Sequence, residues 1–234
     1  HISFVITALW WFGLTIPLLK NVHQTHYLEN RSNQVSHALS RIGQTLKKIR
    51  KNPSVLYFII AYFCYIDGVY TIISMATTYG GEVGISDTNM ILALLLTQFI
   101  AFPCAIFAGN LAEKVGTLKV IRVSILIYCG SCIFGYQLDK AWEFWVLAVV
   151  VGMAQGGIQS LSRSYFGRLI PKNESNEYFG FFDIFGKFAD FFGPMIMSFC
   201  ALVLGSSTYG ILGLLLLFVV GYILLRKIPE NQEK

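Results

Sequence analysis

Residues 181–193 read FFDIFGKFADFFG, and this stretch decides the fold class. It lies within an apolar run, 178–203, which is long enough to cross a bilayer, since about 20 helical residues span the hydrocarbon core. Three charged residues, Asp183, Lys187 and Asp190, interrupt the phenylalanines. Charges within a membrane helix are costly and often mark functional sites. The stretch therefore indicates a membrane helix with a role beyond anchoring.

The composition extends this interpretation to the whole chain. Of 234 residues, 55% are hydrophobic and only 13% are charged, against about 25% charged residues in soluble domains. The apolar runs are about twice as long as the strands of outer-membrane barrels. We therefore expect an all-α, polytopic membrane helical bundle. Its predicted spans are 2–19, 54–79, 86–109, 119–138, 141–163, 178–203 and 207–226.

The basic residues predict the orientation of these spans. Every lysine and arginine other than Lys140 and Lys187 falls in or beside alternate connections. Because cytoplasmic loops are enriched in lysine and arginine, the first span is expected to start outside and the C-terminus to be cytoplasmic. These dispersed charges account for the net charge of +5 and do not indicate a nucleic-acid partner. We expect a protein integral to a membrane, the bacterial inner membrane.

The connection 20–53 is the only long one, and it divides the chain. Its second half, ALSRIGQTLKKIRKNP at 38–53, is basic and amphipathic, which is compatible with a short surface helix beside anionic lipid. The expected organisation is one span (1–19), a basic cytoplasmic linker (20–53), a six-helix bundle (54–226) and a cytoplasmic tail (227–234). The chain starts with His1 inside an apolar run, so we expect a fragment without its natural N-terminus.

The charged stretch has two faces if it is one continuous helix. At 100° per residue, Asp183, Lys187 and Asp190 share a narrow face. The opposite face holds phenylalanines 181, 185, 188 and 192. A charged seam of this kind is expected to face protein or a water-filled cavity. The three charges could instead pair with one another and only rigidify the bundle, and Asp183 is the most expendable of them.

Asp67 is the only formal charge in the run 54–79, and Tyr70 and Thr71 lie on the same side of that helix. At 1.5 Å per residue, Asp67 lies about 20 Å from the cytoplasmic end of its span, with Lys187 about 14 Å and Asp190 about 18 Å from theirs. A buried carboxylate favours a nearby cation or a proton. We therefore expect Lys187 within direct or water-bridged reach of Asp67.

Glutamines provide further polar groups at mid-membrane. Gln155 and Gln159 are one helical turn apart, and Gln98 lies in the run 86–109. Gly152 and Gly156 form a GxxxG pattern, which is typical of a helix-packing face. Each buried amide needs a partner, so the glutamines are candidate contacts for a polar solute.

The connection GNLAEKVGTLK, residues 109–119, resembles the short-loop signature of the major facilitator superfamily. Gly109, Glu113, Lys114 and Gly116 match its main positions, together with Leu111 and Lys119. Glu113 replaces the usual aspartate, and Thr117 stands where a basic residue is common. The resemblance implies a cytoplasmic gate at this turn.

Three more stretches narrow the resemblance: YIDGVYTII (65–73), QGGIQSLSRSYFGRLIP (155–171) and YFGFFDIFGKFADFFGP (178–194). Together they resemble the superfamily branch of the yeast vacuolar amino-acid effluxer and its bacterial relatives. This resemblance implies the C-terminal half of a twelve-helix carrier, or permease, preceded by its sixth helix. It also implies alternating access, a missing N-terminal half as partner, a small polar solute such as an amino acid or short peptide, and protons as the candidate coupling ion.

Two other classes of protein are alternatives. The spans fit the topology of a seven-helix receptor, although the third lacks an acidic–Arg–aromatic ending and the seventh an NPxxY-like kink; a non-transporting membrane protein is the other. An enzyme is not expected, because the spans contain no HExxH or GxSxG motif and no His/Asp cluster. We accordingly expect no catalytic residue, metal or cofactor.

Overall fold

A computed structural model describes residues 2–22, 34–206 and 208–229 of the chain. Over these residues the regular structure is entirely helical. The chain divides into two compact units after Ser40. The first contains helix α1 (Ile2–Asn21), and helix α2 (Gln34–Lys51) continues into the second.

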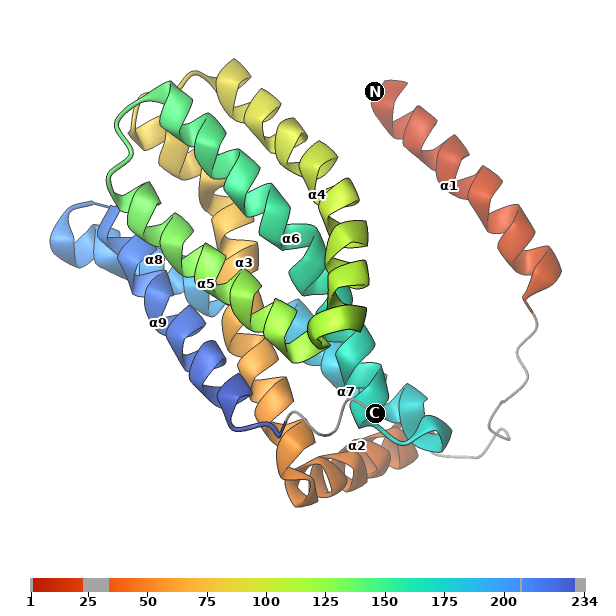
Figure 1. Cartoon of the computed structure of the whole chain (residues 1–234). Coiled ribbons are helices and arrows are strands. Elements are labelled where there is room, and N and C mark those ends of the chain that lie inside the picture. Colours follow the sequence, from red (N-terminus) through yellow and green to blue (C-terminus); the bar gives the residue numbers. More distant parts are fainter. Residues whose placement is uncertain (1, 23–33, 207, 230–234) are drawn as a thin grey trace. The chain divides into compact units, whose positions relative to one another are not determined.

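The second unit is a helical bundle (Figure 1). Its elements after α2 are α3 (Pro53–Glu82), α4 (Asp87–Val115), α5 (Thr117–Tyr136), α6 (Ala141–Leu169), the short 3-10 helix η1 (Lys172–Glu174), α7 (Ser175–Phe188), α8 (Phe192–Leu204) and α9 (Thr208–Arg226). Among the described residues, seven segments are long and apolar enough to cross a membrane, with α7 and α8 together forming one. The predicted polytopic helical fold is thus confirmed.

Local sequence signals explain where the helices begin and end. Asn52 caps α3 by accepting the backbone N–H of Val55, and Pro53 occupies the first turn, where its missing N–H costs nothing. The α4–α5 turn is Gly116, whose φ of 99° favours glycine. At the start of α6, the Glu143 carboxylate accepts the backbone N–H groups of Asp139 and Lys140.

Small residues allow the helices to approach closely. On α6, a Cβ at Gly152 would lie 2.9 Å from the Thr97 carbonyl oxygen, and one at Gly156 would collide with the Ala101 carbonyl oxygen. The GxxxG pattern is therefore the face of α6 that packs on α4, as predicted. Gly68 and Gly221 serve the α3–α9 contact in the same way.

Two sequence predictions need comment. The amphipathic segment within 38–53 is helical, as expected, and forms part of α2. The expectation of one continuous helix over 178–203 is wrong, because the span is broken between Phe188 and Phe192. The division at 1–19, 20–53, 54–226 and 227–234 into carrier parts remains a prediction.

Candidate functional site

The most unusual backbone in the bundle lies between α7 and α8, at residues 189–191, which we call the span break. The N–H of Ala189 closes the last turn of α7 on the Phe185 carbonyl. Asp190 then has a φ of 113° and is the only described non-glycine residue with a positive φ. Such a conformation is costly for a residue with a side chain and persists only where its surroundings enforce it. The break also leaves the first N–H groups of α8 without helical partners.

Asp67 on α3 supplies partners for these groups. One carboxylate oxygen accepts the Asp190 N–H at 2.7 Å, and the other accepts the Gly193 N–H at 3.1 Å. Asp67 is fully buried. A carboxylate is favourable at a helix N-terminus, because free N–H groups and the helix dipole place positive charge there. Asp67 thus ties the middle of α3 to the start of α8.

A close approach of two helices makes this contact possible. A Cβ at Gly193 would collide with the Thr71 hydroxyl and lie 2.7 Å from the Thr71 Cβ. The Thr71 hydroxyl is turned along its own helix and donates to the Asp67 carbonyl at 2.7 Å. Glycine at 193 is therefore required for the Asp67 carboxylate to reach the backbone of α8.

The other charges of the stretch separate from one another. The exposed Asp190 carboxylate accepts the Ser74 hydroxyl at 3.0 Å. Asp183 pairs with Arg163 of α6 at 2.9 Å, and both side chains are substantially exposed. The predicted seam therefore does not exist as one face, because the span break redirects the chain after Phe188.

Lys187 is exposed and lies in the last turn of α7. We expected Lys187 within direct or water-bridged reach of Asp67. Within the described part of the chain the two form no direct ion pair, and a water-bridged contact remains a prediction. The physical reason is that both Asp67 oxygens already accept backbone N–H groups of α8. A cation in a last helical turn is favourable for its own helix.

The phenylalanines pack differently from the predicted opposite face. Phe185 and Phe192 both meet Phe63 of α3 edge-on, whereas Phe188 is 65% exposed. The fully buried ring is Phe182, which stacks on Tyr62 at 4.0 Å and on Phe166 at 4.4 Å between ring centroids. This aromatic stack holds α7 against α3 and α6 and thereby fixes the helix that leads into the span break.

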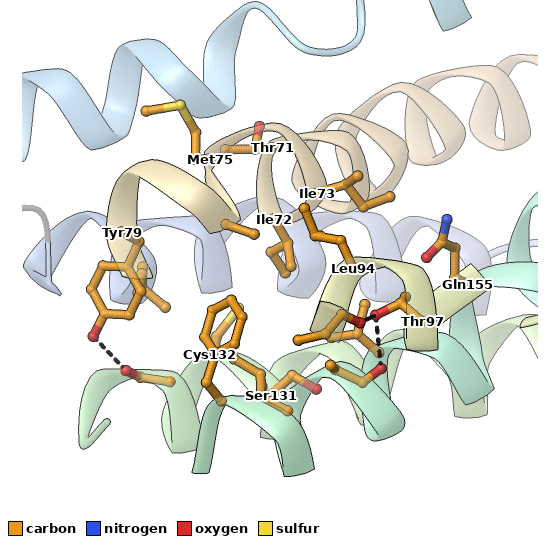
Figure 2. Close-up of a pocket in the computed structure, with 18 of the residues that line it drawn as sticks. Thr71, Ile72, Ile73, Met75, Tyr79, Leu94, Thr97, Ser131, Cys132 and Gln155 are labelled. Carbon is orange, nitrogen blue, oxygen red and sulfur yellow. Dashed lines mark hydrogen bonds between the residues drawn. The ribbon is translucent and has the colours of Figure 1, made fainter. Parts of the chain in front are cut away.

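A cavity of about 70 Å³ lies inside the bundle. Its wall is mostly apolar and comes from α3, α4, α5, α6, α8 and α9. Figure 2 shows Tyr79 at one end of the labelled lining and Gln155 at the other. Tyr79 donates to the Gly135 carbonyl and Thr97 to the Ala148 carbonyl, so these hydroxyl protons are already used.

Gln155 differs from these groups. This residue is only 7% exposed, and its buried side-chain oxygen has no hydrogen-bond partner among the residues that the structure describes. A buried acceptor without a partner costs free energy, about 1–3 kcal/mol. Thr71 and Gln98 line the same cavity, so the structure brings three of the predicted polar residues together. Tyr70 and Gln159 are half-buried and lie outside the lining.

The predicted gate residues lie at the α4–α5 turn. Gly109 is half-buried in α4, Glu113 and Lys114 are exposed in its last turn, and Gly116 forms the turn. Thr117, one of the two positions that depart from the signature, has a role of its own. Thr117 is buried, and its hydroxyl accepts a hydrogen bond from the Arg168 guanidinium at 2.6 Å. This bond joins the end of α6 to the start of α5.

Comparison with known proteins adds a family assignment. The family described as "Vacuole effluxer Atg22 like" matches residues 1–234. An "Uncharacterized MFS-type transporter YxiO" of Bacillus subtilis is 44% identical over 231 residues, which are 99% of this chain and 54% of that protein. "Autophagy-related protein 22" of Kluyveromyces lactis is 25% identical over 219 residues, 84% of this chain and 44% of that protein. The chain spans about half the length of these curated relatives.

Proposed function

Because this chain belongs to the Atg22-like branch of the major facilitator superfamily, we propose that it is the C-terminal part of a secondary carrier. The carrier moves a small polar solute, an amino acid or short peptide, across the bacterial inner membrane by alternating access. The N-terminal half of the carrier is its partner, and the C-terminus is cytoplasmic. No catalysis is involved, since the family consists of transporters.

The observation that carries this proposal is the pair of hydrogen bonds that the Asp67 carboxylate accepts from the N–H groups of Asp190 and Gly193. Charge-assisted hydrogen bonds are roughly twice as strong as neutral ones. Proton uptake by Asp67 would remove the charge that attracts the start of α8. The contact between α3 and α8 would then weaken, and the population of conformers would shift. Asp67 is thereby the proposed coupling residue, with the proton as coupling ion.

A cation precedes the span break and an anion lies within it. The Lys187 ammonium and the Asp190 carboxylate are exposed three residues apart, and neither is paired with an opposite charge among the described residues. A solute with both an ammonium and a carboxylate can be bound by such a pair of opposite charges. This supports an amino acid or peptide as the solute and gives Lys187 and Asp190 the role of solute contacts.

Polar groups on neighbouring helices complete the proposed solute path. The unpartnered Gln155 oxygen can accept a donor from the solute. Tyr70 and Gln159 are half-buried, and Thr71 and Gln98 line the cavity. The gate residues Gly109, Glu113, Lys114 and Gly116 lie at the ends of helices rather than on this path, which suits a role in closing it.

The experiment that tests the function is solute uptake by the full-length protein in proteoliposomes. A panel of amino acids and dipeptides is supplied with and without an inward proton gradient. We expect gradient-stimulated uptake of at least one solute, and loss of that uptake in Lys187→Gln and Asp190→Asn. Absence of uptake across the panel, with protein oriented and monodisperse, would refute the proposed solute class.

A further inference from the structure

Helix α2 is fixed to the second unit along one face from Thr45 onward. Thr45 and Ile49 are buried, and the Thr45 hydroxyl donates to the Glu177 carboxylate at 3.0 Å. The Lys48 ammonium donates to Glu174 at 2.7 Å. This hydrogen bond raises the pKa of Lys48, so the anchor stays charged at neutral pH. The orientation of α2 about its own axis is therefore set.

The opposite face of α2 is cationic. Relative to Ile49, the helix places Arg50 at about 100°, Lys47 at about 160° and Lys51 at about 200°. All three side chains are exposed, and among the described residues none of them has an ion-pair partner. Ile42 and Leu46 are also exposed on this helix, at 44% and 40%. Leu46, at about 60° from Ile49, borders the cationic face, whereas Ile42, at about 20°, lies on the anchored side and lines a pocket with Glu177 and Phe181.

A second element adds cations at the same end of the bundle. Helix α3 begins at Pro53, directly after α2, and α9 ends at Arg226. The Lys227 ammonium lies 5.6 Å from the centroid of the Tyr57 ring, one turn into α3. Figure 1 shows the end of α9 beside the start of α3, with α2 lying across this end of the bundle. Because α3 and α9 are membrane spans, their ends lie at the depth of lipid headgroups.

We propose that this surface, the basic corner, binds the headgroup of an anionic phospholipid. The basic corner consists of Lys47, Arg50, Lys51, Arg226 and Lys227. Its cations match the phosphate charge, and Leu46, at the edge of the cationic face, enters the boundary between headgroups and acyl chains, as in other interfacial amphipathic helices. The position of the surface at the end of two spans favours lipid over a free anion. This inference does not depend on transport.

The test measures binding of fluorescent phosphatidylglycerol and phosphatidylcholine to the full-length protein in detergent. The wild type is expected to prefer phosphatidylglycerol by roughly tenfold at about 0.1 M salt, and to lose most of this preference at about 1 M salt, where the screening length is about 3 Å. The triple variant Lys47→Gln, Arg50→Gln, Lys51→Gln should lose most of the preference. The control Lys114→Gln, Lys119→Gln, Lys140→Gln removes the same charge at exposed positions outside the basic corner and should keep it.

Three outcomes of the lipid comparison would overturn the proposal, as would the competition result given after them. They are an unchanged preference in the α2 triple variant, an equal loss in the control variant, and a preference that salt does not reduce. Millimolar inorganic phosphate should compete only weakly; full displacement by it would show a simple anion site instead of a lipid site. The salt series uses the wild type alone, so the proposal stays testable if the triple variant does not fold.

Discussion

The carboxylate of Asp67 accepts the backbone N–H of Gly193 at 3.1 Å, joining two membrane spans that are 126 residues apart in the sequence. The same carboxylate accepts the N–H of Asp190. One buried anion therefore caps the helix that restarts after the span break. The proposed proton coupling depends on this capping contact, because the contact connects a single titratable group with the position of α8.

The Gly193–Thr71 contact predicts that Gly193→Ala destabilises the protein. The added Cβ would lie closer to Thr71 than van der Waals contact allows. Overpacking of this kind costs about 1–3 kcal/mol. The thermal unfolding midpoint in detergent should fall by several degrees. Gly180→Ala is the matched control, because nothing lies within 4 Å of its Cβ position. Equal midpoints for both variants would argue against the tight α3–α8 approach.

The buried hydroxyl pair of Tyr65 and Ser162 predicts coupled mutational effects. The two oxygens are 2.6 Å apart, and both residues are fully buried. Ser162→Ala leaves the Tyr65 hydroxyl without this partner, which should cost about 1–3 kcal/mol. The double variant Tyr65→Phe, Ser162→Ala should recover much of that loss. A strictly additive cycle in unfolding measurements would show that the two hydroxyls are not coupled.

The Arg163–Asp183 pair predicts only a small effect on stability. Exposed ion pairs contribute about 0–1 kcal/mol, and these side chains are 60% and 44% exposed. Asp183→Asn should therefore change the unfolding midpoint little. A large loss would instead favour the charged triad as a structural unit. The comparison is made by thermal unfolding of the full-length protein.

The orphan oxygen of Gln155 predicts an effect on solute affinity. Gln155→Met keeps the size of the side chain and removes the acceptor, so KM should rise roughly three- to tenfold for one lost hydrogen bond, while kcat changes little. Gln137→Met, at an exposed position outside the cavity lining, is the control. An unchanged KM in Gln155→Met would remove Gln155 from the solute path.

Long apolar runs made the seven spans predictable, because the length of each run reflects the thickness of the bilayer. The span break was not predicted, because the phenylalanine-rich sequence is apolar on both sides of it and hydropathy therefore shows one uninterrupted span. One signal was present: Gly193 and Pro194 follow Asp190 after two phenylalanines, and proline in a first helical turn marks a new helix start. Without the break, helical periodicity placed Asp190 beside Lys187, and the backbone N–H partners of Asp67 stayed hidden.

The depth estimate for Asp67 succeeded in one respect and failed in another. It placed Asp67 and Asp190 at similar depths, and the structure brings these residues together. It offered a cation or a proton as the partner of Asp67 and did not foresee the backbone N–H groups that the carboxylate accepts. A free helix start satisfies a carboxylate equally well, and sequence periodicity contains no information about a helix that restarts within a span.

Uptake by Asp67→Asn with and without a proton gradient is the decisive test of proton coupling at Asp67. The variant keeps the shape of the side chain and removes its charge. We predict that an inward proton gradient stimulates uptake by the full-length wild type and by the control Asp139→Asn. Asp67→Asn should lose this stimulation but still exchange labelled for unlabelled solute without a gradient. Undiminished gradient-stimulated uptake in Asp67→Asn would show that Asp67 is not the coupling residue.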